Sequence, residues 1–275
     1  MKHFKRGMAL FFVLVIGMGC AHAQAYVSVA DLRQQAMDNP IEAEVLIPSN
    51  NQVPVLTVGT DALAEEQPLV VTVGSFDESV SGRFQESTRY GKTPSHTALT
   101  NGLSLEAAQA LLDDELKRLL NKTIDDYGLI WTEIAEWKNM ETWLLYYGQR
   151  FESMTCFNIG LTMDARNEAY RHMIIPHFEE KKRIYDDVPL AAWPVVMESV
   201  HDFLSQHKAA KADTLELGYL LRESGQDSVL VPVWRLDYMA PNGYGESYFS
   251  AQTGEAIVWE SEYLLPEPFG WEAAS

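Results

Sequence analysis

The sequence predicts an α+β fold of two tandem units, each a helix followed by an antiparallel sheet, with a β-rich segment in front of them. Two observations carry this prediction: residues 104–163 read as a helix and about three strands, and residues 193–259 repeat that order. The two stretches share no residue-level identity, so only the order of their patterns supports a repeat. The predicted boundaries are a signal peptide at 1–23, a β-rich segment with a linker at 24–102, a first α+β unit at 103–188 and a second α+β unit at 189–275.

The first residues have the pattern of a secretory signal peptide. An apolar run at 8–18 follows three basic residues and precedes a small-x-small cleavage site, Ala21-His22-Ala23. This run is well short of the roughly 20 apolar residues that a membrane span needs, and no later run is longer. We therefore expect a secreted or envelope-associated chain that begins at Gln24 and has no transmembrane helix. The alternative is a lipoprotein acylated at Cys20, and mass spectrometry of the mature N-terminus separates the two.

The chain is strongly acidic, with a formal net charge of −18 at pH 7. Cleavage after Ala23 removes the positive charges of Lys2, Lys5 and Arg6 and leaves −18 − 3 = −21. A field of that sign repels phosphate backbones and anionic lipid headgroups, so we expect no nucleic-acid partner. The acidic surface serves solubility outside the cytoplasm, or it attracts a basic partner such as a cationic peptide, a wall polymer or loosely held divalent cations.

Cleavage also leaves Cys156 as the only cysteine, because the chain holds two and the other is Cys20. No intramolecular disulfide can then form, so the fold must rest on packing. A single cysteine in a strand pattern is typical of a small buried hydrophobe. A nucleophilic role would require a histidine beside it, which the sequence alone does not place.

The N-terminal segment is predicted to hold one short helix and three strands, at 31–39, 41–47, 53–58 and 69–73. None of these pieces is a helix long enough for a parallel crossover, which favours antiparallel pairing. Residues 74–102 are rich in Ser, Thr and Gly and predict a long loop. The loop contains Gly91-Lys92-Thr93, the tail of a phosphate-binding loop, but Glu86 stands where that motif requires its first Gly, so nucleotide binding is disfavoured.

Ser104 is predicted to cap the helix of the first unit, and leucines recur at helical spacing after it. Strands are predicted at 129–137, 143–147 and 157–163, and residues 165–185 read as a helix broken at Pro176. Four residues of that helix invite a metal site: His172, His177, Glu179 and Glu180. The two histidines are five positions apart with a proline between them, so they would not share a face, and we favour a solvated helix surface.

Trp193-Pro194 predicts the start of the helix of the second unit, because proline suits the first turn. Strands are predicted at 215–221, 230–238, 245–251 and 256–259, and Pro241-Asn242-Gly243 is a strong turn signal. In the strand at 230–238, Arg235 and Asp237 lie on the face opposite to Leu230, Trp234, Leu236 and Tyr238.

The second unit contains L-G-Y at 217–219, V-P-V-W at 231–234 and Y-F-S-A-Q-T-G-E-A-I at 248–257. These runs resemble the end of PepSY-like extracytoplasmic modules, above all the YycH/YycI and YpeB types of the Gram-positive envelope. Four residues match the ending of that family: Ala251, Thr253, Gly254 and Ile257. The residue before Ala251, which is usually Asn or Asp in the family, is Ser250 here. The resemblance covers the C-terminal part only and implies a non-catalytic role in binding or restraining partners, including proteases and sensor-kinase ectodomains.

We therefore expect a non-catalytic extracytoplasmic binding or regulatory module of a bacterial cell envelope, whose partner is an envelope protein or peptide. No catalytic, cofactor-binding or metal-binding residue is predicted, and no cofactor. The alternative is a secreted hydrolase: serine and zinc hydrolase motifs are absent, but 39 acidic residues leave a carboxylate pair open. A lipid-anchored structural protein is a third reading, which differs only in the fate of Cys20. Two buried carboxylates facing each other in a deep cleft would favour the hydrolase, and an exposed groove of Trp, Tyr and acidic side chains would favour binding.

Overall fold

A computed structural model describes residues 26–60, 69–73, 86–90, 92, 98–100, 102–137, 140–167, 170–175, 178–207, 211–224, 227–241 and 243–257. The predicted signal peptide and Cys20 lie outside these residues, as does the end of the chain from residue 258. Three α-helices are described, α1 (Val29–Asp38), α2 (Leu105–Leu120) and α3 (Trp193–Gln206), with a 3₁₀ turn, η2 (Ile124–Asp126). Among the described helices, none is long and apolar enough to cross a membrane.

The described strands are β1 (Tyr26–Val27), β2 (Glu44–Leu46), β3 (Val55–Thr60), β4 (Leu69–Val73), β5 (Glu86–Tyr90), β6 (Tyr127–Trp137), β7 (Met140–Phe151), β8 (Met154–Asn167), β9 (Tyr170–Ile175), β10 (Phe178–Tyr185), β11 (Leu190–Ala191), β12 (Lys211–Ser224), β13 (Asp227–Ala240), β14 (Gly243–Ser250) and β15 (Ala256–Ile257). In this part of the chain, β1 pairs with β11 and all the other strands form one thirteen-stranded sheet. Its main path runs β10-β3-β13-β12-β8-β7-β6-β5.

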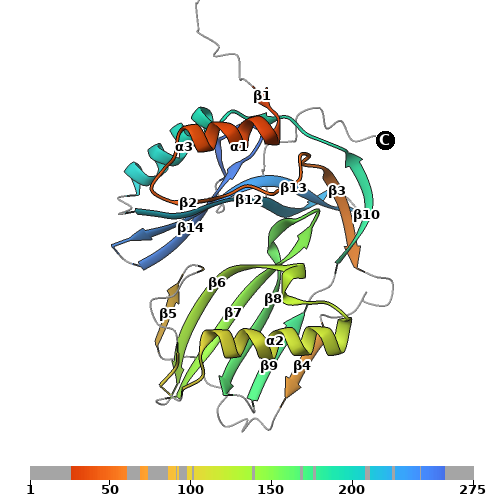
Figure 1. Cartoon of the computed structure of the whole chain (residues 1–275), viewed down its shortest axis with the longest axis vertical. Helices are drawn as coiled ribbons and strands as arrows, with labels where there is room; N and C mark the ends of the chain where they lie inside the picture. The colour runs from red at the N-terminus through yellow and green to blue at the C-terminus, as the bar shows by residue number, and fades with distance from the viewer. Residues whose placement is uncertain are drawn as a thin grey trace, which may run out of the picture.

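The upper half of this sheet, drawn at the top of Figure 1, consists of β2, β3, β10 and β12 to β15. Helices α1 and α3 cover one face of it (Figure 1). Apolar residues of both helices pack there against the central strands, in one cluster with Leu32, Val196, Leu217 and Trp234. Trp193 and Trp234 meet edge to face, with ring centroids 5.8 Å apart. These contacts explain why α3 has an apolar stripe along one side. The helix has Pro194 in its first turn, as the sequence predicts.

The lower half consists of β4 to β9, and α2 lies across one of its faces (Figure 1). The helix begins where the sequence predicts, because the Ser104 side chain accepts a hydrogen bond from the Ala107 amide. Leu112 and Leu116 are fully buried against alternate residues of the strands, among them Trp143 and Leu161. The period of two along each strand therefore places the other residues on the opposite face of the lower half.

The prediction of two tandem helix-plus-sheet units is wrong, because the described residues are mostly β and all of their strands except β1 and β11 belong to one mixed sheet. Strands from the N-terminal segment are integral to the upper half: β3 lies between β10 and β13, and β2 pairs with β12. The pairing of β2 with β12 is parallel, not antiparallel as expected. Strand β5 occupies part of the region predicted as a loop. The predicted domain boundaries stay a prediction.

The predicted helix at 165–185 is also wrong, since β8 continues to Asn167 and β9 and β10 follow it. Glu179 to Arg183 have good helix propensity, but β10 pairs with β3 along its whole length and keeps these five side chains in water. Tertiary pairing therefore overrides local propensity here. His172 lies on β9, and His177 and Pro176 are outside the described residues.

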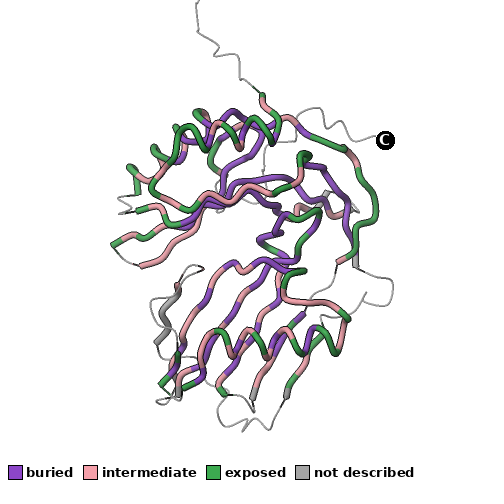
Figure 2. Tube along the Cα trace, viewed as in Figure 1, coloured by how far each residue is buried: buried purple, intermediate pink, exposed green. Residues whose placement is uncertain are grey.

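The two halves meet at a joint that we define by the parallel contact of β12 with β8, where Tyr219 pairs with Cys156. The Asn158 side chain extends this contact, since its amide donates to the Leu221 carbonyl at 3.0 Å and accepts from the Leu221 amide at 2.7 Å. Gly218 permits the close approach, because a Cβ there would lie 2.4 Å from the Thr155 carbonyl oxygen. Figure 2 shows the buried trace continuing from one half into the other across this joint.

Candidate functional site

The face of the lower half that α2 leaves uncovered carries two rows of side chains, each crossing five paired strands from β6 to β4. We call these rows the open face. The register of the strands places them as follows: Trp131, Tyr146, Thr162, Ile174 and Val70 in one row, and Glu133, Leu144, Asp164, His172 and Thr72 in the other. All ten side chains are half-buried or exposed.

The first row is mainly aromatic and apolar. Trp131 and Tyr146 stack with ring centroids 5.3 Å apart, next to the joint. At the other end, Ile174 and Val70 are paired across strands and keep 37% and 53% of their surface in water. Water-exposed apolar side chains in adjoining positions are a feature of surfaces that bind other molecules.

The second row is polar and acidic apart from Leu144. Asp164 accepts a hydrogen bond from the Thr142 hydroxyl and lies 3.4 Å from the Arg166 guanidinium. The Thr72 hydroxyl and the His172 Nδ1 are 2.9 Å apart. Glu133 and Asp164 thus place two carboxylates beside the apolar row. The open face combines aromatic, aliphatic and acidic side chains on one rigid sheet.

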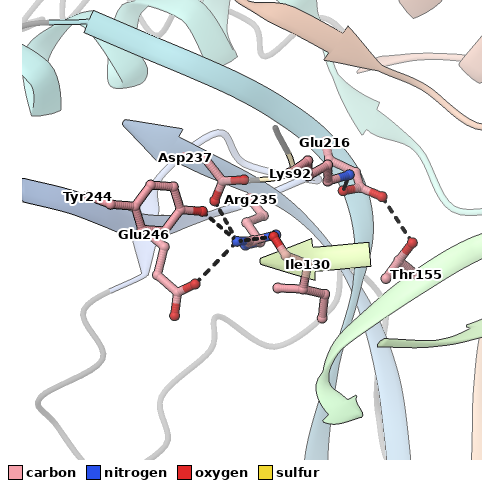
Figure 3. Close-up of polar contacts among 8 residues, drawn as sticks. All are labelled: Lys92, Ile130, Thr155, Glu216, Arg235, Asp237, Tyr244 and Glu246. Atoms are coloured by element: carbon pink, nitrogen blue, oxygen red, sulfur yellow. Dashed lines mark hydrogen bonds and ion pairs between the residues drawn. The ribbon is translucent and has the colours of Figure 1, made fainter. Parts of the chain in front are cut away.

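A buried ionic cluster lies at the joint, where Arg235 of β13 meets Ile130 of β6 (Figure 3). Arg235 is 1% exposed, and its two terminal nitrogens both donate to the Ile130 carbonyl at 3.1 Å. Ile130 is the extra residue of a β-bulge in β6, so its carbonyl is directed out of the strand ladder. Arg235 therefore ties β13 of the upper half to β6 of the lower half.

The same guanidinium binds three more groups in the upper half. Its Nη2 donates to the Tyr244 hydroxyl at 2.9 Å and lies 3.4 Å from the Glu246 carboxylate. It also forms an ion pair with Asp237 Oδ1 at 2.6 Å, although the two groups are not aligned as a hydrogen bond. Asp237 and Glu246 are directly opposite each other on β13 and β14, so the cation between them offsets the repulsion of two like charges.

Glu216 of β12 forms the second part of this cluster. It accepts a hydrogen bond from the Thr155 hydroxyl of β8 at 2.9 Å, and it pairs with Lys92. Lys92 thus stabilises the joint in the described structure. We call Lys92, Thr155, Glu216, Arg235, Asp237, Tyr244 and Glu246 the joint cluster.

Burial changes the proton affinity of these groups. It raises the pKa of Asp237 to about 6, and the nearby Arg235 charge only partly opposes that shift. Burial tends to lower the pKa of Arg235, but the Asp237 carboxylate outweighs it, so the guanidinium stays charged. Burial also raises the pKa of Tyr244 above its ordinary value.

Cys156 is fully buried, as the sequence predicts for a small hydrophobe, and burial raises the pKa of its thiol to about 12. A thiol of that pKa is protonated at neutral pH, which does not favour a nucleophilic role. Among the described residues, no group of three or more His, Cys, Asp and Glu side chains is arranged to hold a metal ion.

Sequence reasoning placed Arg235 and Asp237 opposite to Trp234 but missed the joint cluster. One signal was available: the Pro241-Asn242-Gly243 turn predicts a hairpin whose register sets Asp237 against Glu246. The contacts of Arg235 with Ile130 and of Glu216 with Thr155 were not predictable, because they join strands far apart in the sequence.

Comparisons with known proteins give little further information. No family model matches the chain, and no curated protein does. Among solved structures, the chain is similar to the crystal structure of an uncharacterized protein from Eubacterium rectale ATCC 33656. That similarity has 11% identity and a TM-score of 0.48, and it covers 78% of this chain and 89% of the other. We base no inference on it.

Proposed function

We propose that the protein is a non-catalytic binding or regulatory module of a bacterial cell envelope, acting outside the cytoplasm, and that its open face binds the partner. The observation that carries this proposal is the double row of half-buried and exposed side chains across five strands, with apolar and acidic residues side by side. The signal-peptide pattern supports the location, and the resemblance to PepSY-like modules supports the non-catalytic role.

The chemistry of the open face indicates the kind of partner. Ile174 and Val70 offer water-exposed apolar area, and the half-buried rings of Trp131 and Tyr146, which also pack against the core of the upper half, lie in the same row. Glu133 offers negative charge in a chain of net charge −18, whereas the charge of Asp164 is offset by Arg166. Aromatic side chains also attract cations over their rings. A protein segment or peptide that carries both apolar and basic side chains complements this surface, and its approach is favoured by the acidic field of the whole chain.

The hydrolase alternative is less well supported by the geometry. Asp237 and Glu246 form a carboxylate pair, but Asp237 is 1% exposed and both carboxylates bind Arg235. A substrate therefore cannot reach Asp237 in this structure. The arrangement is better suited to fixing the two halves of the sheet than to general acid–base chemistry.

Ile174→Lys should weaken partner binding at least ~10-fold, because it puts a positive charge, which repels a basic partner, into the exposed apolar end of the first row. The fold should tolerate this change, since 37% of the Ile174 surface is already in water. Immobilised wild-type protein and variant are compared for capture of envelope proteins, and affinity is then measured for the captured protein.

Met37→Lys is the matched control, because Met37 is an apolar residue of α1 with 68% of its surface in water and lies in the other half of the molecule. The proposal is supported if a protein with a basic, apolar segment is retained by the wild type and by the control but not by Ile174→Lys. Equal retention by all three proteins, or hydrolysis of envelope material without any retained partner, contradicts it.

A further inference from the structure

The edge strands of the sheet differ in how they are protected. Among the described strands of five or more residues, three pair with a single neighbour: β4, β5 and β10. A strand edge without a partner presents backbone N–H and C=O groups that can pair with another chain, and charged side chains are the usual protection against this. Strand β10 carries five consecutive charged residues in water, Glu179 to Arg183, and β5 includes Glu86 and Arg89. Strand β4, with the sequence L-V-V-T-V, has no charged residue and no proline.

Strand β4 also exposes an apolar side chain on each of its faces. Val70 lies on the open face and has 53% of its surface in water. Leu69 is 40% exposed and lies on the other face, because it pairs with Ile175, which is buried in the core beneath α2. A molecule lying flat on the open face would leave Leu69 in water. An extended segment paired with β4 would alternate its side chains between the two faces and would contact both residues.

We propose that the partner binds by strand addition: an extended segment of the partner pairs with the edge of β4 that faces away from β9, and so lengthens the sheet. This inference rests on the proposed function, in which the open face is the binding site, and it adds the conformation of the bound partner. Backbone hydrogen bonds to β4 supply part of the affinity, and the side chains on both faces of the edge select the sequence of the segment.

The open face indicates which residues the added segment carries. Side chains of paired strands align, so the segment extends each row of the open face by one position. Its residue beside Val70 continues the apolar row, and its residue beside Thr72 continues the polar and acidic row. On the face that α2 covers, a further residue lies beside Leu69. The segment therefore has apolar residues beside Leu69 and Val70 and a polar or basic residue beside Thr72.

The charge of the chain favours a basic segment over a second copy of this protein. Two copies, each with a formal net charge of −18, repel each other, whereas a basic segment is attracted. The occupant of the β4 edge is therefore a basic, apolar segment of another protein, and pairing of two copies through β4 is the competing outcome of the experiment.

The probe is the fluorescein-labelled peptide KKVVVKK, which reads the same in both directions and so suits either strand orientation. The control peptide KKVPVKK has the same charge, but its central proline lacks an N–H group and does not suit the middle of a strand. Fluorescence anisotropy with the purified protein measures both affinities at about 150 mM salt, where distant charges are screened. KKVVVKK should bind at least ~5-fold more tightly than the control peptide. Equal affinities, or no binding of either peptide, overturn the proposal.

Leu69→Lys tests the binding mode, because Leu69 lies outside the open face. It should weaken the binding of KKVVVKK at least ~5-fold, since it replaces an apolar contact by a charge that repels the peptide. The fold should tolerate the change, because Leu69 is already 40% exposed. Met37→Lys adds the same charge in the other half of the molecule and should leave the affinity unchanged. An unchanged affinity in Leu69→Lys, or an equal loss in both variants, overturns strand addition.

Ile174→Lys separates strand addition from the proposed function. Loss of KKVVVKK binding in both Leu69→Lys and Ile174→Lys supports the two together. Loss in Ile174→Lys alone overturns strand addition and leaves the open face as the binding site, whereas loss in Leu69→Lys alone supports strand addition and contradicts the open face. Sedimentation tests the competing outcome: a dimer of the purified protein that Leu69→Lys converts to a monomer would assign the edge to a second copy and overturn the proposal.

Discussion

Arg235→Met should lower the free energy of unfolding by about 3–5 kcal/mol, because it leaves Asp237 as a buried charge without its cation. The change also removes both donors to the Ile130 carbonyl, which is the tie between β13 and β6. Met roughly matches the length of the arginine stem, so little of the loss should come from a cavity. Urea denaturation at pH 7 followed by circular dichroism measures the difference.

A second variant separates the cost of the unpaired Asp237 charge from the cost of lost packing. Arg235→Met combined with Asp237→Asn should recover about 1–3 kcal/mol of the loss, because the double variant buries no unpaired carboxylate. If the double variant is no more stable than Arg235→Met alone, the ion pair is not the reason for the loss. An Arg235→Met protein as stable as wild type would contradict the assigned role of the guanidinium.

Trp234→Ala should cost about 3–5 kcal/mol, because it removes a fully buried indole from the centre of the core under α1 and α3. The cavity would lie against Trp193, whose ring meets Trp234 at a centroid distance of 5.8 Å. Thermal and urea unfolding of the variant measure the loss.

Trp234→Phe is the graded comparison for this prediction. It keeps an aromatic ring next to Trp193 and should cost clearly less than the alanine change. The Trp234 indole nitrogen has no hydrogen-bond partner in the described structure, so its removal should carry no penalty of its own. Equal losses for the two variants would mean that packing against Trp193 does not set the stability of this layer.

Local signals predicted much of the secondary structure. The α2 helix begins after Ser104, α3 begins at Trp193-Pro194, and a hairpin turn connects β13 to β14. Each of these features depends on residues close together in the sequence: a cap, a proline in the first turn, or glycine at a turn, where Gly243 has φ +119°. Such signals do not need knowledge of the tertiary partner.

The arrangement of the sheet could not be predicted in the same way. Residues 178–185 form a strand only because β3, more than a hundred residues earlier in the chain, pairs with them. The joint depends on Tyr219, Cys156 and the Asn158 side chain meeting across the sheet. A repeat of helix and strands in the sequence therefore suggested two units, whereas long-range pairing forms one mixed sheet. The burial of Arg235 and Asp237 follows from that pairing, so it could not be predicted from the sequence either.

The open face could be recognised only after the register was known. Alternation along β6 to β9 identifies two faces, but α2 decides which of them is covered. The rows that end at Val70 and Thr72 also require the pairing of β4 with β9, which lie about a hundred residues apart.

The most direct test of the binding role is hydrogen exchange of the protein, alone and with its captured partner bound. Binding at the open face should slow the exchange of backbone amides in β4 and in β6 to β9, and leave the exchange of amides in α1 and α3 unchanged. Protection confined to α1, α3 or the far strands of the upper half would contradict binding at the open face.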